Sequence, residues 1–205
     1  MAVCLALVPG ARTSAWGAGV GLVSGFFRNR IDDVLMRICD VMMSFPSEVM
    51  ILAIVGMTGP GLENVVIANV VAKWPWYARM VRSIVRQYSD KDYIRFAKVA
   101  GGSSIRIMMR HLLPGTAGEL FVLTTLDTGS VILIFSALSF PGLGVQPPTP
   151  EWGMMLNEAK EVMTLYPLQM IPAGMAILLV VAAFNFFGDS LRDAFAPKHA
   201  GRDRS

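Results

Sequence analysis

Two charged side chains, Lys73 and Asp127, lie deep within long apolar stretches of the sequence. Lys73 follows Leu62, where one stretch begins, by about 11 residues, or roughly 16 Å of helix. Asp127 lies about 12 residues, or roughly 18 Å, into another stretch, and Ser130 follows it closely. A charge in hydrocarbon is costly, so such residues generally face protein or water and serve a function. These three residues are therefore candidates for a polar path across a membrane.

Each charge also has a structural explanation. The Lys73 side chain can extend to the membrane surface, where Trp74, Trp76 and Tyr77 would form an interfacial aromatic belt. Asp127 can be a hydrogen-bonded structural carboxylate that pairs with Lys73. The residues alone leave both interpretations of Lys73 equally open, and for Asp127 they slightly favour the path.

The sequence lacks the common motifs of catalysis and nucleotide binding. Neither HExxH nor GxxxxGK[ST] occurs, and the only histidines, His111 and His199, lie outside the apolar stretches. Cys4 and Cys39 have no second pair with which to form a zinc site, so we interpret both as buried apolar residues. We predict no resident cofactor and no metal site. An intramembrane enzyme would need a catalytic pair in the membrane plane, and only a carboxylate pair stays open.

The apolar stretches predict helices that cross a membrane. The chain has 205 residues, of which 54% are hydrophobic and only 16% charged, and this composition points away from a soluble fold. Several runs approach the roughly 20 residues that cross about 30 Å of hydrocarbon. They are 167–188, 115–140, 62–81, 41–58 and an irregular run before Phe27. Within the run from Ile31 to Thr58, the residues Ser44, Pro46, Ser47 and Glu48 are expected to break or re-aim the helix, since proline has no backbone N–H to donate. We predict an all-α integral membrane protein with about five transmembrane helices.

The distribution of positive charge predicts the orientation of these helices. Fifteen of the 18 Lys and Arg residues fall in three intervals, which alternate with intervals nearly free of them. The positive-inside rule then puts 28–40, 79–113 and 189–205 in the cytoplasm, and 59–63 and 141–166 outside. A nucleic-acid-binding protein would concentrate its charge on one soluble face. The distribution of the charge, and not its net value of +3, thus indicates a multi-pass chain surrounded by lipid, without a nucleic-acid partner.

The longest polar interval, 79–114, predicts two short amphipathic helices joined at an elbow. Asp92 is expected to cap the first helix, Gly101 and Gly102 to end it, and Pro114 to close the unit. Apolar residues repeat at helical spacing on both sides of the elbow: Tyr93, Phe96, Ala97 and Ala100, then Ile105, Met108, Met109 and Leu112. Such a unit lies at a membrane surface or fits the groove of a partner, and the pattern leaves these two open.

The segment YIRFAKVAGGSSIRIMMRHLLP resembles the cytoplasmic EAA loop of permease subunits of binding-protein-dependent ABC importers. The family pattern is Glu-Ala-Ala, a Gly four residues later and a final Leu-Pro. Ala97, Gly101 and the ending from His111 match it, whereas Arg95 stands in place of the Glu and Phe96 in place of the first Ala. The resemblance implies that this loop docks on an ATPase subunit and couples it to transport.

Five further segments resemble the second permease subunit of dipeptide, oligopeptide and nickel importers: DDVLMRICDVMMSFP, TGPGL, WPWYARMVRS, LSFPGLGVQPPTPEWG and GDSLRDAFAP. The resemblance implies the type I permease fold in the inner membrane of a bacterium, two ATPase subunits that hold ATP and Mg²⁺, and a second, similar permease subunit. The family usually starts about one span earlier. We therefore expect 1–27 to be an incomplete N-terminal membrane segment, 28–197 the permease domain and 198–205 a cytoplasmic tail.

The resemblance also implies a solute-binding protein outside the cell, which would meet the loop around Pro141, Gly142, Gly144 and Trp152. WPWYARMVRS and the segment around Asp127 look most like nickel permeases, so we expect import of nickel, free or chelated, with dipeptide or oligopeptide import as the alternative. A lysine near the path suits a chelated metal or a peptide carboxylate better than a bare dication. A secondary transporter would need an internal repeat, and we find no convincing one.

Overall fold

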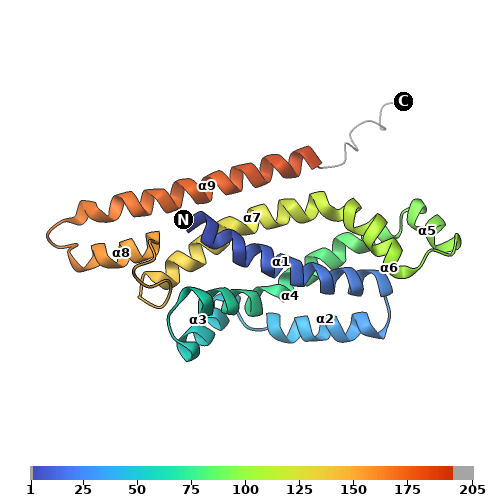
Figure 1. Cartoon of the computed structure of the whole chain (residues 1–205), viewed down its shortest axis with the longest axis horizontal. Coiled ribbons are helices and arrows are strands. Elements are labelled where there is room, and N and C mark those ends of the chain that lie inside the picture. The colour runs from blue at the N-terminus through green and yellow to red at the C-terminus, as the bar shows by residue number, and fades with distance from the viewer. Residues whose placement is uncertain (1, 196–205) are drawn as a thin grey trace.

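The computed structural model describes residues 2–195, with side chains from residue 10 onward, and this part of the chain is helical with no strand. The helices are α1 (Ala2–Phe27), α2 (Arg30–Met43), α3 (Ser47–Thr58), α4 (Leu62–Ser89), α5 (Asp92–Val99), α6 (Ser104–Ile107), α7 (Leu113–Ser139), α8 (Trp152–Glu161) and α9 (Met170–Phe195). A π-helical turn, Met108–Leu112, and a 3-10 turn, Pro167–Gln169, complete them. The long helices run along one axis, with the α5–α6 elbow at one end and α8 toward the other (Figure 1). The predicted all-α fold is confirmed, and the predicted tail, 198–205, lies outside the described residues.

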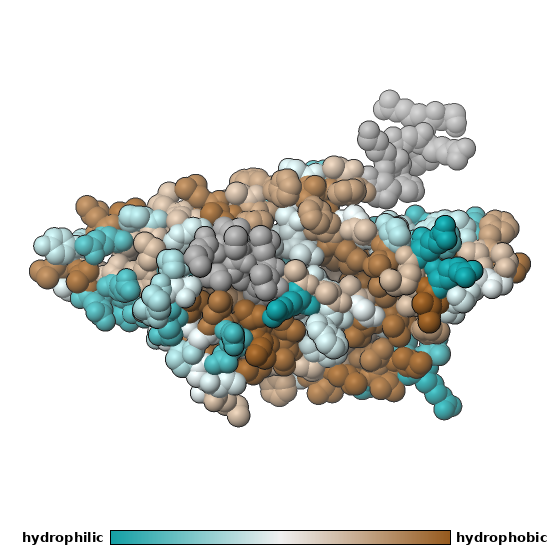
Figure 2. Space-filling view, in the orientation of Figure 1, coloured by the Kyte–Doolittle hydropathy of each residue, from teal (hydrophilic) through white to brown (hydrophobic). Residues whose placement is uncertain are grey.

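Two helical stretches within the described residues are long and apolar enough to cross a membrane: 104–139, which runs from α6 through α7, and 167–195, which contains α9. Helices α2 and α3 together would make a third, although they are bent by 77°. Helices α1 and α4 have 26 and 28 residues, which is also sufficient length. Figure 2 shows apolar side chains over much of one side of the bundle. The total of about five spans stays a prediction.

The predicted break in the run from Ile31 to Thr58 is present between α2 and α3. The Ser44 hydroxyl donates to the carbonyl oxygen of Val41 at 2.6 Å, at the end of α2. Pro46 has no N–H to donate and precedes the first residue of α3. The bend turns α3 out of the line of α2, and a cavity opens on its inner side.

Helix α1 packs closely along α4 through three glycines at four-residue spacing, Gly17, Gly21 and Gly25, which the sequence analysis did not single out. A Cβ atom at Gly17 would lie 2.3 Å from the Cβ of Tyr77, and one at Gly21 would lie 2.7 Å from the Cβ of Val81. Small residues at this spacing let two helix backbones approach each other within a membrane. The contact at Gly17 fixes the position of Tyr77, whose hydroxyl donates to Asp127 of α7.

Replacing Gly21 by valine should therefore lower the yield of folded chain. The added side chain would overlap the α4 backbone, where the carbonyl oxygen of Ala78 lies 2.7 Å from the Cβ position, and overpacking typically costs about 1–3 kcal/mol. Gly19→Val is the matched control, because nothing lies within 4 Å of a Cβ atom at Gly19. The measurement is the monodisperse fraction and the thermal midpoint in detergent. Equal values for the two variants would contradict the close packing of α1 on α4.

A buried carboxylate joins α1, α2 and α4 near the end of the bundle that carries the elbow. Asp32 is 2% exposed and accepts two hydrogen bonds from Arg82, from Nε at 2.6 Å and from Nη2 at 2.7 Å. It also accepts from Arg86 and from the Ser24 hydroxyl. Two guanidinium groups thus share one carboxylate, a strong charge-assisted arrangement.

Candidate functional site

The two charges that the sequence places within apolar stretches meet in the structure. Lys73 Nζ lies 2.5 Å from Asp127 Oδ1, and the Tyr77 hydroxyl donates to Asp127 Oδ2 at 2.9 Å. The exposed fractions are 9% for Lys73, 8% for Asp127 and 1% for Tyr77. The predicted pairing of Lys73 with Asp127 is therefore present. The alternative, a lysine that extends to an aromatic belt containing Tyr77, is wrong, because both side chains turn inward to α7.

The threonines around Asp127 on α7 bond within their own helix, whereas Asp127 bonds to side chains of α4. The hydroxyls of Thr124, Thr125 and Thr128 donate to carbonyl oxygens one turn earlier in the same helix, at 2.9, 2.8 and 2.8 Å. Threonines that bond in this way satisfy their own hydroxyls and need no partner from another helix. Lys73 and Tyr77 are four residues apart on α4, so both can reach the same carboxylate.

A cavity of about 660 Å³ contains all three predicted path residues, Lys73, Asp127 and Ser130. Its other wall is the bend between α2 and α3, which contributes Glu48. The cavity depends on the bend, because a straight continuation of α2 would carry this wall away. The sequence predicted both the bend and the polar residues, but not that they enclose one space.

A second cavity, of about 790 Å³, shares part of its lining with the first. Trp76, Asp127 and Ser130 line both of them. Most of the remaining polar lining comes from α4, α7 and α9: Ser83, Gln87, Glu119, Asn185 and Arg192. Gln87 lies near the end of α4 that leads into α5, so polar side chains line these largely apolar cavities from Lys73 to the elbow end of α4. The sequence analysis assigned neither Glu119 nor Arg192 to a path.

The elbow residues are placed much as predicted, with two corrections. Gly101 has φ +80° and ends α5, and α6 begins after the elbow. Asp92 does not cap α5 but is its first residue, and Lys91 occupies the capping position without a side-chain hydrogen bond. Pro114 does not close the unit. It lies in the first turn of α7, and the π-helical turn just before it gives the helix room to continue past the proline ring.

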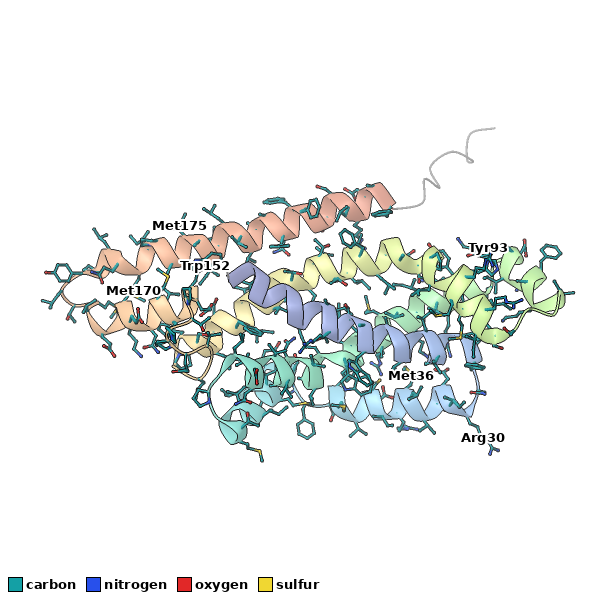
Figure 3. All side chains as sticks on the ribbon, viewed as in Figure 1. Arg30, Met36, Tyr93, Trp152, Met170 and Met175 are labelled. Atoms are coloured by element: carbon teal, nitrogen blue, oxygen red, sulfur yellow. The ribbon has the colours of Figure 1, made fainter. Side chains whose placement is uncertain are left out.

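The elbow presents an apolar surface that the rest of the described chain leaves open. Tyr93 is 45% exposed and Phe96 73%, whereas Ile94 is fully buried, so the predicted face turns outward and a different residue anchors α5. Arg95 and His111 are exposed, and Ala97 and Gly102 are half-buried. Figure 3 shows Tyr93 at the end of the bundle that carries the elbow, well away from Trp152.

The loop between α7 and α8 holds the outer residues that the sequence singled out. Gly142 has φ +85°, and Gly144 is buried with its carbonyl oxygen accepting from Gly61 N at 3.1 Å. Pro141 is exposed and Trp152 half-buried. Glu151, which the sequence analysis missed, caps α8 by accepting from Met154 N at 3.0 Å and is 5% exposed. Helix α8 packs back along α9 instead of lying across the ends of the long helices (Figure 1).

The described residues contain no group of three or more His, Cys, Asp and Glu side chains that could hold a metal ion. Cys39 is fully buried beside Met36 and Ala78, as predicted for an apolar residue. The side chain of Cys4 and the whole of His199 lie outside the described part. The carboxylates that line the two cavities are Glu48 and Asp127 in the first and Glu119 and Asp127 in the second.

Residues 17–200 match the model of a protein family described as "Binding-protein-dependent transport system inner membrane component". The chain belongs to this family. Its members are transport components of the inner membrane and not enzymes, so the predicted resemblance is confirmed. The division into 1–27, 28–197 and 198–205 stays a prediction.

Three curated relatives of this permease family are similar to most of the chain. They are the permease protein CntC of a metal-staphylopine import system from Staphylococcus aureus (42% identity), the nickel transport system permease protein NikC from Escherichia coli (40%) and the glutathione transport system permease protein GsiD from Pectobacterium atrosepticum (41%). The matches cover 85%, 88% and 89% of the chain and 60%, 64% and 60% of those relatives. The chain therefore spans less than two thirds of the length of each of these permeases.

The fold is that of a solved permease as well. The chain matches a structure of the MetNI methionine ABC transporter in inward-facing conformations with a TM-score of 0.77 and 16% identity, and the match covers 94% of this chain and 92% of the other. At this identity the likeness concerns the fold alone. It confirms the predicted type I permease fold.

Proposed function

We propose that this permease family member is the transmembrane permease subunit of a binding-protein-dependent ABC importer, and that its solute is nickel, free or chelated. The observation that carries the proposal is the pair of cavities that share Asp127 and Ser130 in their lining, the second of which reaches Gln87 near the elbow end of α4. A subunit that moves a solute needs a polar route past its apolar helices, and irregular or polar structure at membrane depth is tolerated where it lines such a cavity.

The proposed partners on the cytoplasmic side are two ATPase subunits, which would supply ATP and Mg²⁺. The exposed Tyr93 and Phe96 on α5 support this docking, since an apolar helical face of this kind fits a hydrophobic groove. Arg95, in place of the family's Glu, is exposed beside them and would give the contact a positive charge. Movement of α5 would pass to α1 and α4 through Ile94, which belongs to the same buried cluster as Phe26 and Val85.

Two further partners are proposed on the basis of the family. A second, similar permease subunit would close the open side of the two cavities, because one copy lines only part of a route. A solute-binding protein outside the cell would meet the loop around Pro141, Gly142 and Trp152, of which Pro141 is exposed. Both proposals are tested by isolating the assembled transporter from cells that express the neighbouring transporter genes.

Nickel is supported by the relatives CntC, a permease of a metal-staphylopine import system, and NikC, a permease of a nickel transport system. The relative GsiD, a glutathione permease, supports the second candidate, import of a dipeptide or oligopeptide. The Lys73 ammonium in the first cavity favours either solute in a form that carries a carboxylate.

The deciding measurement is uptake of radiolabelled nickel, with and without competing dipeptides, in cells that express the chain together with its neighbouring transporter genes. We expect energy-dependent nickel uptake that dipeptides leave unchanged. Dipeptide uptake without nickel uptake would refute nickel as the solute and support peptide import instead. Uptake of neither, in cells that contain the assembled complex, would refute the importer role for these solutes.

A further inference from the structure

The two oxygens of the Asp127 carboxylate have different donors. Lys73 Nζ contacts Oδ1 at 2.5 Å, and the Tyr77 hydroxyl donates to Oδ2 at 2.9 Å. Tyr77 is 1% exposed and packs against Gly17 of α1, so its hydroxyl is held in position. Lys73 could therefore turn away from Asp127 without leaving the carboxylate bare. The lysine is the exchangeable partner, and the tyrosine is the fixed one.

The charged lining of the first cavity consists of one ammonium, Lys73, and two carboxylates, Asp127 and Glu48. Glu48 is exposed and accepts from the Ser47 hydroxyl at 3.0 Å, so its carboxylate is not occupied by a cation in the described chain. A bare dication that approached Asp127 Oδ1 would meet the Lys73 ammonium, which already occupies that position. The two carboxylates alone would attract a metal ion. The Lys73 ammonium, however, keeps such an ion away from Asp127, the more buried of the two.

A solute with a carboxylate of its own changes this balance. Its carboxylate can accept from Lys73 Nζ, and the freed Asp127 Oδ1 can then receive a cationic group of the same solute. Every buried charge keeps a counter-ion during this exchange, which avoids the large cost of leaving one charge of a buried pair alone. A free metal ion has no acceptor group to which Lys73 Nζ could donate in place of Asp127.

We propose that Lys73 and Asp127 form an exchangeable ion pair, which selects solutes that carry both a carboxylate and a cationic group. The inference rests on the proposed import function and narrows its solute. An amino-acid chelate of nickel fits this class, a short peptide shares the same chemistry, and free nickel does not. Asp127 lines both cavities, whereas Lys73 lines only the first. A cationic group of the solute bound to Asp127 Oδ1 would therefore lie where the two cavities share their lining. Tyr77 acts as a positioning residue that keeps Asp127 oriented during the exchange.

The test uses the transporter assembled with its partner subunits and reconstituted into liposomes that contain ATP. Three probes are compared: radiolabelled nickel alone, radiolabelled nickel in excess histidine, and a radiolabelled dipeptide. The wild type should take up at least one of the two carboxylate-bearing probes about tenfold faster than nickel alone, as expected for a charge-assisted contact. The two carboxylate-bearing probes distinguish a metal chelate from a peptide as the source of the shared chemistry.

Four variants separate the exchange from a structural role. Lys73→Gln should lower uptake of the preferred probe about tenfold and raise uptake of nickel alone, because Asp127 Oδ1 becomes free. Lys73→Gln combined with Asp127→Asn leaves no unpaired buried charge and should assemble, yet lose both uptakes. Tyr77→Phe should weaken binding of the preferred probe while the complex stays intact. Lys160→Gln, an exposed lysine on α8, is the matched control and should behave as the wild type.

The outcomes are distinguishable. If the assembled wild type takes up free nickel as fast as both other probes, or if Lys73→Gln assembles and its preference among the probes is unchanged, the exchange is refuted and the importer function stands. If the assembled wild type takes up none of the three probes, the proposed function is refuted and the exchange with it. A preference that shifts from the carboxylate-bearing probe to free nickel in Lys73→Gln alone supports the exchange.

Discussion

Asp32→Asn should sharply reduce the amount of folded chain that accumulates in the membrane. The carboxylate is 2% exposed and is shared by the guanidinium groups of Arg82 and Arg86, with a further hydrogen bond from Ser24. An amide carries no charge, so two arginines would lose their counter-ion at a point where three helices meet. Breaking a fully buried pair by removing one partner typically costs about 3–5 kcal/mol. The side chains of Arg82 and Arg86 are 24% and 38% exposed, so solvent screens the charges left behind and the expected cost lies below this range, which is still a substantial part of the stability of an ordinary domain.

The neighbouring residue provides the matched control. Asp33 is exposed, and no ion pair or side-chain hydrogen bond of it is found in the described chain, so Asp33→Asn removes the same charge from the same helical turn without this cost. The measurement is the quantity of monodisperse protein extracted in mild detergent and its thermal midpoint. The two variants should differ widely. If both accumulate to the wild-type level, the Asp32 cluster contributes little, and the α1–α2–α4 contact must be held by apolar packing alone.

The sequence predicted those parts of the fold that depend on neighbours along the chain. The break before α3 follows from Pro46, which lacks a backbone donor, and the end of α5 follows from Gly101, which tolerates a positive φ. Long apolar runs likewise predict α7 and α9 without reference to other residues. Pro114 was misjudged, because a proline generally marks a boundary, and nothing in the sequence indicates that a π-helical turn will accommodate it.

The site was predicted in its residues and only partly in its contacts. Apolar surroundings single out Lys73 and Asp127, and opposite charges at membrane depth suggest that they pair. Tyr77 was assigned to the membrane surface, because its role depends on the rotation of α4, and that rotation is set by contacts with glycines 60 residues earlier in the chain. The partners of Asp32 are missed for the same reason: Arg82 is 50 residues away, and periodicity indicates a buried face but not the helix that covers it.

Gly101→Pro should uncouple ATP hydrolysis from transport in the assembled complex. Gly101 has φ +80°, which the proline ring excludes, and its N–H donates to the carbonyl oxygen of Lys98 at 3.1 Å, a bond that proline cannot make. Gly102 N donates to the carbonyl oxygen of Ala97 at 3.1 Å, so the two bonds together form the Schellman ending of α5. Proline would therefore change the direction in which α5 leaves the elbow while the rest of the bundle stays intact.

If α5 is the lever through which the ATPase moves the permease, a redirected α5 should still allow ATP hydrolysis but lower solute transport by at least about tenfold, as when a positioning element is misplaced. Ser103→Pro is the matched control, because Ser103 has φ −64°, close to the value that proline requires, and its N–H makes no backbone hydrogen bond in the loop. Hydrolysis and uptake are measured in the same liposomes. Coupled transport at the wild-type rate in Gly101→Pro would remove α5 as the lever, whereas uncoupling in both variants would show that any proline disturbs the elbow. Only uncoupling confined to Gly101→Pro ties the transmission of force to the left-handed glycine that ends this helix.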